Sequence, residues 1–245
     1  MHSINVTAHN SGESTYDTGE GATFTMPELS QRLENAEPVK QFHLALNYLD
    51  RLTSKTREIT SDQNLSQTGK DTRLDPVRTE ALQNIAAGAE TLNRYEAQIN
   101  AREAEMLALP KLPEQATVAA IEEREIRDYW RSQSLEERTK ISRQMQDNPA
   151  AHERLMLAVL RSPIPVALDE GKELMTELWS AARRASNPEL AASIADSRQA
   201  LEWARRGYAH AAVIARRRTT WPGDKVRKAL MSGNELAIKG ASVFG

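Results

Sequence analysis

The residues best suited to do chemistry in this chain are the cations of its C-terminal end. Residues 201–245 hold nine Lys and Arg against three Asp and Glu, although the net charge of the whole chain is −2. Trp203, Tyr208 and Trp221 lie among these cations. Cationic side chains contact phosphates, and aromatic rings offer nucleobases a stacking surface. The candidate contacts to a nucleic acid or an acidic partner are Arg205, Arg206, Arg216, Arg217, Arg218, Lys225, Arg227 and Lys228.

The same cations also have a purely structural interpretation. Positive charges near the C-terminus of a helix complement its dipole, and arginines pair with acidic surfaces of neighbouring subunits. The sequence contains no recognised nucleic-acid-binding motif. Both interpretations therefore stay open.

The sequence contains no recognised motif for catalysis or for cofactor binding. The five histidines are scattered and form no H-E-x-x-H pattern, and Gly69-Lys70-Asp71 lacks the rest of a phosphate-binding loop. The absence of cysteine excludes disulfides, thiolate metal ligands and cysteine nucleophiles. We expect no catalytic residue, no metal and no cofactor. An enzyme with an unrecognised helical active site remains an alternative, because thirty-four acidic residues offer no way to single out a catalytic pair.

Amphipathic helices must position these side chains. Apolar residues at intervals of three and four predict one helix over 38–60 and a longer one over 76–109, which begins at Asp75-Pro76 and pairs with the first as a hairpin. Pro27 is expected to start a short helix before them. Pro110 and Pro113 mark a boundary.

The second half of the chain predicts shorter helices, then one long helix. Thr117–Arg131 carries Val118, Ile121, Ile126 and Trp130, and Ser134 opens the next helix as a capping box. Two more helices complete a four-helix module. A long helix then runs from Pro188 to about Arg218, followed by a turn and a short basic helix.

We expect an all-α fold whose first residues form a polar arm. Residues 1–26 are too poor in apolar side chains to offset the entropy of ordering on their own. The sequence shows neither a signal peptide nor a membrane-spanning stretch. The expected segments are an extended polar arm (1–26), a short helix plus long helical hairpin (27–109), a compact multi-helix module (110–187) and a long helix with a basic tail (188–245).

One region resembles a known class of proteins. The stretch from Glu125 to Lys140, followed by Leu155–Pro163, is similar to stretches in helical virion and morphogenesis accessory proteins of tailed bacteriophages. The resemblance covers roughly residues 120–190 and carries no functional residue. It implies a structural component such as a head–tail connector, a minor capsid protein or an internal protein, located in the virion or in the host cytoplasm during assembly.

The leading hypothesis is therefore a non-catalytic assembly protein that forms homo-oligomers or binds other virion proteins. The arm would bind neighbouring subunits, since their contact would offset its ordering cost. Phe24, Trp203 and Trp221 are the candidate interface anchors, because large aromatic side chains often dominate interface energy. Nucleic-acid binding through the basic end is the main alternative.

Overall fold

A computed structural model of the chain describes residues 4–111, 116–162 and 169–241. It is mostly helical, as expected, with eight α-helices and one small β-sheet in the described residues. The chain forms two compact units: unit 1 comprises residues 1–99 and 195–245, and unit 2 comprises residues 100–194. This division differs from the four expected segments, because the last long helix contributes to the same unit as the hairpin.

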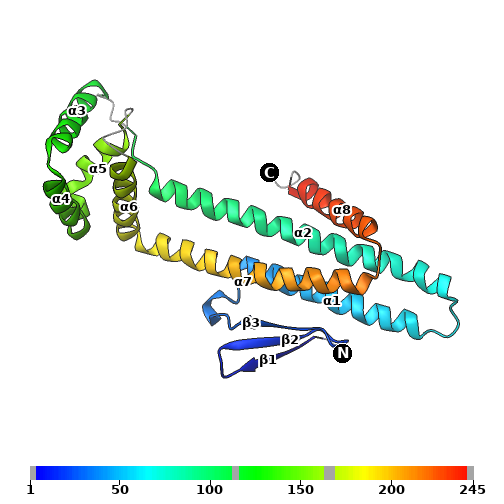
Figure 1. Cartoon of the computed structure of the whole chain (residues 1–245). Helices are drawn as coiled ribbons and strands as arrows, with labels where there is room; N and C mark the ends of the chain where they lie inside the picture. The colour runs from blue at the N-terminus through cyan, green and yellow to red at the C-terminus, as the bar shows by residue number, and fades with distance from the viewer. Residues whose placement is uncertain (1–3, 112–115, 163–168, 242–245) are drawn as a thin grey trace. The chain divides into compact units, whose positions relative to one another are not determined.

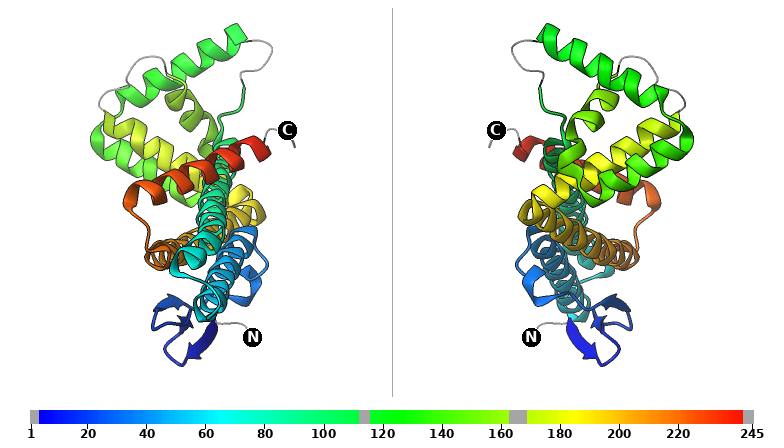
Figure 2. Two further views of the ribbon diagram at one scale, coloured as in Figure 1. Left: turned by 90° about the vertical axis from the view of Figure 1, so that its right-hand side faces the viewer. Right: turned by 90° about the vertical axis from the view of Figure 1, so that its left-hand side faces the viewer.

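Unit 1 is built on three helices that lie side by side (Figures 1 and 2). They are α1 (Glu37–Ser61) and the parts of α2 (Gln67–Leu107) and α7 (Pro188–Thr219) that belong to this unit. Their apolar faces meet in a core that buries Leu49, Leu82, Ile85 and Leu201. The last helix, α8 (Gly223–Ala241), packs on α2, where Gln83 Nε2 donates to Ser232 Oγ at 2.5 Å.

A glycine allows α1 and α7 to approach closely. A Cβ atom at Gly207 of α7 would lie 2.5 Å from the ring of Phe42 on α1. The glycine thus admits an aromatic ring of the neighbouring helix. Glycine inside a helix costs about 1 kcal/mol relative to alanine, which the packing of the fully buried Phe42 ring offsets.

The start of α2 differs from the prediction. The helix begins at Gln67, and Pro76 lies inside it. Proline at such a position gives up the helical hydrogen bond to the carbonyl four residues earlier. Tertiary contacts override the local signal for a helix start. Leu74 is buried in unit 1. The carboxylate of Asp75, expected to cap a helix, instead accepts hydrogen bonds from Trp221 and Lys225.

The expected polar arm is wrong for the described residues from 4 onward. They form a three-stranded antiparallel sheet of β1 (Asn5–His9), β2 (Glu13–Asp17) and β3 (Thr23–Pro27), in which Val6, Tyr16 and Phe24 are aligned across the strands. Tyr16, Phe24 and Met26 are buried against the helices, which supplies the apolar area that the segment lacks alone. The expected helix at Pro27 is wrong too, because Pro27 ends β3 and only a short 3-10 helix follows at Gln31–Leu33.

Unit 2 contains the four helices that the sequence predicts. They are α3 (Ala116–Ser132), α4 (Leu135–Asp147), α5 (Glu153–Leu160) and α6 (Asp169–Ser186), with a 3-10 helix at Pro149–His152. The capping prediction at Ser134 is confirmed, since Ser134 Oγ accepts from the Glu137 amide at 3.2 Å. The core of the unit consists of Trp130, Ile141, Met145, Leu155, Met156, Val159, Met175, Leu178 and Trp179.

Candidate binding surfaces

Phe24 and Trp203, expected at a partner interface, lie in the core of unit 1. The ring of Phe24 stacks on that of His210 with centroids 4.9 Å apart, and Trp203 meets Phe42 edge to face at 5.2 Å. Trp203 Nε1 also donates to the Pro27 carbonyl at 2.7 Å, which ties α7 to the end of β3. Both side chains hold the sheet on the helices, so the expectation that they anchor a partner is corrected.

Arg218 is not a surface cation either. Its side chain is only 9% exposed, and burial lowers the pKa of its guanidinium. Its Nη2 donates to the carbonyls of Thr18 and Gly19 at 2.8 and 2.7 Å, and its Nη1 donates to Thr53 Oγ1 on α1. One guanidinium therefore joins the β2–β3 turn to α1 and α7. We refer to this set of contacts as the Arg218 clamp.

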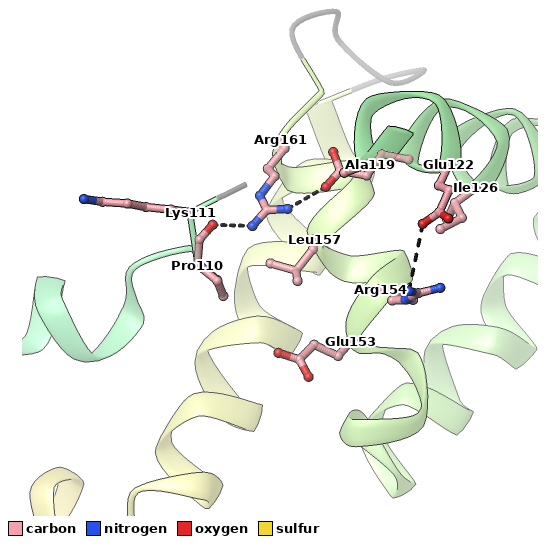
Figure 3. Close-up of a pocket in the computed structure, with 10 residues that line it drawn as sticks. Pro110, Lys111, Ala119, Glu122, Ile126, Glu153, Arg154, Leu157 and Arg161 are labelled. Atoms are coloured by element: carbon pink, nitrogen blue, oxygen red, sulfur yellow. Dashed lines mark hydrogen bonds and ion pairs between the residues drawn. The ribbon is translucent and has the colours of Figure 1, made fainter. Parts of the chain in front are cut away.

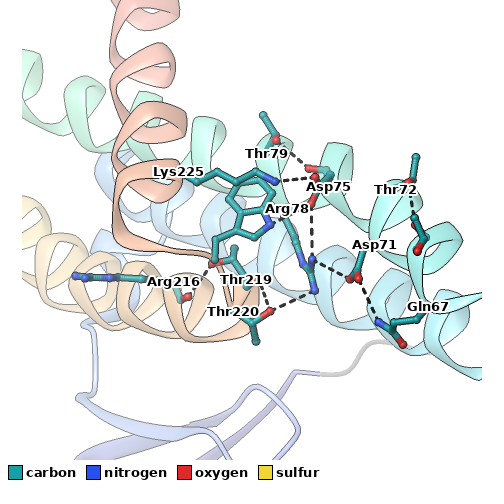
Figure 4. Close-up of polar contacts among 12 residues, drawn as sticks. Gln67, Asp71, Thr72, Asp75, Arg78, Thr79, Arg216, Thr219, Thr220 and Lys225 are labelled. Atoms are coloured by element: carbon teal, nitrogen blue, oxygen red, sulfur yellow. Dashed lines mark hydrogen bonds and ion pairs between the residues drawn. The ribbon is translucent and has the colours of Figure 1, made fainter.

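Trp221 and Lys225 are held inside unit 1 by Asp75 (Figure 4). Asp75 Oδ1 accepts from Trp221 Nε1 at 3.0 Å, and Oδ2 accepts from Lys225 Nζ at 2.7 Å. The ammonium also lies 4.1 Å from the centre of the Trp221 ring. The hydrogen bond from Lys225 lowers the pKa of the Asp75 carboxyl; burial opposes this shift, and the hydrogen bond from Trp221 adds to it. These contacts fix the turn between α7 and α8 on α2, and they give Trp221 an internal role instead of the expected role at an interface.

The remaining candidate cations fall into two groups. Arg205 forms a bidentate pair with Glu96 of α2 at 2.8 Å for both bonds, and Arg206 pairs with Glu202 one turn earlier on α7. By contrast, four cations are exposed, and no carboxylate with a described side chain pairs with them: Arg216, Arg217, Arg227 and Lys228. Arg227 and Lys228 line a hollow on α8 together with Asp224, Met231 and Ser232.

Unit 2 has a hollow of about 310 Å³ with charged walls (Figure 3). Arg161 reaches across it: its Nη1 lies 2.5 Å from Glu123 Oε1 of α3, and its Nη2 donates to the Pro110 carbonyl. Arg127 lies 3.6 Å from the other oxygen of Glu123 and donates to the Ala158 carbonyl of α5. The three side chains are mostly buried. They join α3, α5 and the segment after α2, so they stabilise the unit by satisfying one another's charges.

The outer face of α3 carries exposed apolar side chains, among them two of the four that the sequence analysis named for this helix. Val118, Ile121 and Tyr129 are 52%, 56% and 55% exposed, and Leu135 at the start of α4 is 81% exposed. Trp130 and Ile126 face the core from the other side of the same helix. Exposed apolar groups gathered on one helix face are typical of a surface that binds a protein. We call Val118, Ile121 and Tyr129 the α3 face.

Metal binding and membrane spanning find no support in the described residues. Among the described residues, no group of three or more histidines and acidic residues lies close enough to hold a metal ion. No helix in the described ranges has both the length and the apolar character needed to cross a membrane. Comparisons with protein-family models, with curated proteins and with solved structures find no match to this chain.

Proposed function

We propose that the chain is a non-catalytic assembly protein whose α3 face binds a second copy of itself. The observation that carries this proposal is the exposure of Val118, Ile121 and Tyr129 to solvent, since burial of apolar area drives association. The assignment to a phage particle rests on the sequence resemblance around residues 120–190.

The charges that flank the α3 face favour a second copy over a strongly charged partner. Arg124 and Asp128 are both exposed and lie 3.9 Å apart on α3, and Arg131 pairs with Asp128 from one turn further along. A cation and an acidic residue one turn apart can attract the same pair of charges on a second copy that packs in the opposite direction. When two such helices pack antiparallel about a point midway between these two residues, Arg124 of each chain meets Asp128 of the other.

We expect Ile121→Ser combined with Tyr129→Ser to weaken self-association at least tenfold without changing the melting temperature of the monomer. The reason is that both side chains are exposed in one chain and buried only in the pair, and interface aromatic residues contribute about 2 kcal/mol or more. Sedimentation equilibrium at several concentrations measures the association constant.

Val213→Ser on α7 is the matched control, because Val213 is a similarly exposed apolar residue of unit 1. This variant should associate like the original chain. Equal association constants for the original chain, the α3 double variant and Val213→Ser would show that the α3 face binds no second copy.

The exposed cations at the end of α7 and on α8 favour a second candidate function, nucleic-acid binding. Arg216, Arg217, Arg227 and Lys228 project from unit 1 without a described acidic partner, so they retain their charge for phosphates. The other candidate cations already form ion pairs or hydrogen bonds with groups of unit 1, which restricts this function to these four.

For this function, we expect Arg216→Ala with Arg217→Ala to reduce the slope of log affinity against log salt by about 2 on double-stranded DNA, since each lost phosphate contact removes about 0.9. Fluorescence anisotropy at several salt concentrations measures the slope. Arg206→Ala is the control, because Arg206 is also exposed but already paired with Glu202. An unchanged slope in the double variant, or no binding by the original chain, would contradict this function.

A further inference from the structure

A hollow of about 260 Å³ lies between α1 and α2 in unit 1. Its described lining includes Gln41 and Tyr48 from α1 together with Asn84 and Thr91 from α2. One cation, Arg94, and no carboxylate are among the described lining residues. The walls therefore present hydrogen-bonding groups and positive charge.

The phenol of Tyr208 reaches this hollow from α7, on the other side of the helix pair. Tyr208 is 5% exposed, and among the described residues no group forms a hydrogen bond with its hydroxyl. Burial, with a smaller effect of Tyr48, raises the pKa of Tyr208, so the hydroxyl keeps its proton and remains a donor. The hydroxyl is therefore available to donate a hydrogen bond to a group bound in the hollow.

An unfavourable feature of α2 lies at the same place. A Cβ atom at Gly88 of α2 would lie 1.8 Å from the Tyr208 hydroxyl, so only glycine at this position lets the phenol reach the hollow. Glycine in the middle of a helix is itself unfavourable. A local cost of this kind beside a hollow is typical of a functional site, where stability is given up for binding.

We propose that this hollow binds a small oxyanion, a carboxylate or a phosphate group, through the hydroxyls of Tyr208 and Tyr48 with Arg94 beside them. The phenols donate hydrogen bonds to the anion, and such bonds to a charged acceptor are stronger than bonds between neutral groups. A carboxylate and a phosphate share this chemistry, and the experiment uses one probe for each.

Thermal unfolding of the full chain tests the site with sodium acetate and with sodium phosphate, each compared with sodium chloride at equal ionic strength. At a probe concentration ten times its Kd, one of the two should raise the melting temperature of unit 1 by about 3–5 °C above chloride. Tyr208→Phe should need at least about tenfold more of that probe for the same rise, because it loses a hydrogen bond to a charged group. Tyr129→Phe, which removes a phenol hydroxyl in unit 2, should respond like the original chain.

If Tyr208→Phe does not fold, Tyr48→Phe takes its place in the comparison with Tyr129→Phe, because Tyr48 is a half-buried residue that lines the same hollow. A rise with acetate alone assigns the site to carboxylates, and a rise with phosphate alone assigns it to phosphates. The proposal is overturned if neither probe raises the melting temperature more than chloride does. It is also overturned if the tyrosine variant of the hollow responds to the probe as Tyr129→Phe does.

Discussion

Arg218→Met should lower the free energy of unfolding of unit 1 by about 3 kcal/mol. The substitution keeps much of the apolar stem but removes every donor of the Arg218 clamp. The carbonyls of Thr18 and Gly19 would then be left without the donors that the clamp supplies, at a place where little water reaches. Chemical denaturation, followed by a signal from unit 1, measures the change.

Arg217→Met is the matched control for this prediction. It makes the same chemical change one residue earlier, where the side chain is exposed, and should alter the stability by less than about 0.5 kcal/mol. Hydrogen exchange gives an independent readout, since loss of the clamp should accelerate exchange in β2 and β3 before it affects α1. Similar stabilities for the two variants would mean that the clamp contributes little.

Trp179→Ala should destabilise unit 2 by about 4 kcal/mol, in the range measured when a buried tryptophan is truncated. Trp179 is buried in the core of the unit beside Met175 and Leu178, and its Nε1 donates to the Leu107 carbonyl at 2.8 Å. Truncation would remove both the packing and the donor. Urea unfolding monitored by helix content measures the change, with one transition expected for each unit.

Trp179→Phe separates the two contributions. It keeps most of the buried aromatic area and removes only the donor to Leu107, so it should cost about 1–2 kcal/mol. If the alanine and phenylalanine variants lost equal stability, the hydrogen bond and not the packing would dominate, contrary to the core described for unit 2.

The helices were predictable where apolar periodicity and end signals agreed. Pro38 lies in the first turn of α1, Pro188 is the first residue of α7, and Ser134 caps α4, because each of these signals acts within a few residues. At Asp75-Pro76 the local signal was overridden by contacts with Trp221 and Lys225, which are distant in sequence.

The last strand of the sheet could have been predicted from the alternation of its side chains, although the polar composition of residues 1–26 pointed to an arm. Residues 23–26 alternate between threonine and a large apolar side chain, the pattern of a strand with one buried face. What the segment packs against was not predictable, because the aromatic partners Phe42 and His210 belong to helices far along the chain.

The binding surfaces were the least predictable part. Arg217 and Arg218 are adjacent and chemically identical, yet one is exposed and the other is buried, because successive residues point about 100° apart around a helix. Ile121 and Trp130 are nine residues apart, which places them on opposite sides of α3. That spacing distinguishes Ile121 from Trp130, but it does not say which of the two sides is buried.

The native mass of the purified chain tests the proposed assembly role most directly. If the α3 face binds a second copy, native mass spectrometry should show a species of at least twice 27.4 kDa whose fraction grows with protein concentration. A single species of 27.4 kDa at every concentration would contradict self-assembly through that face.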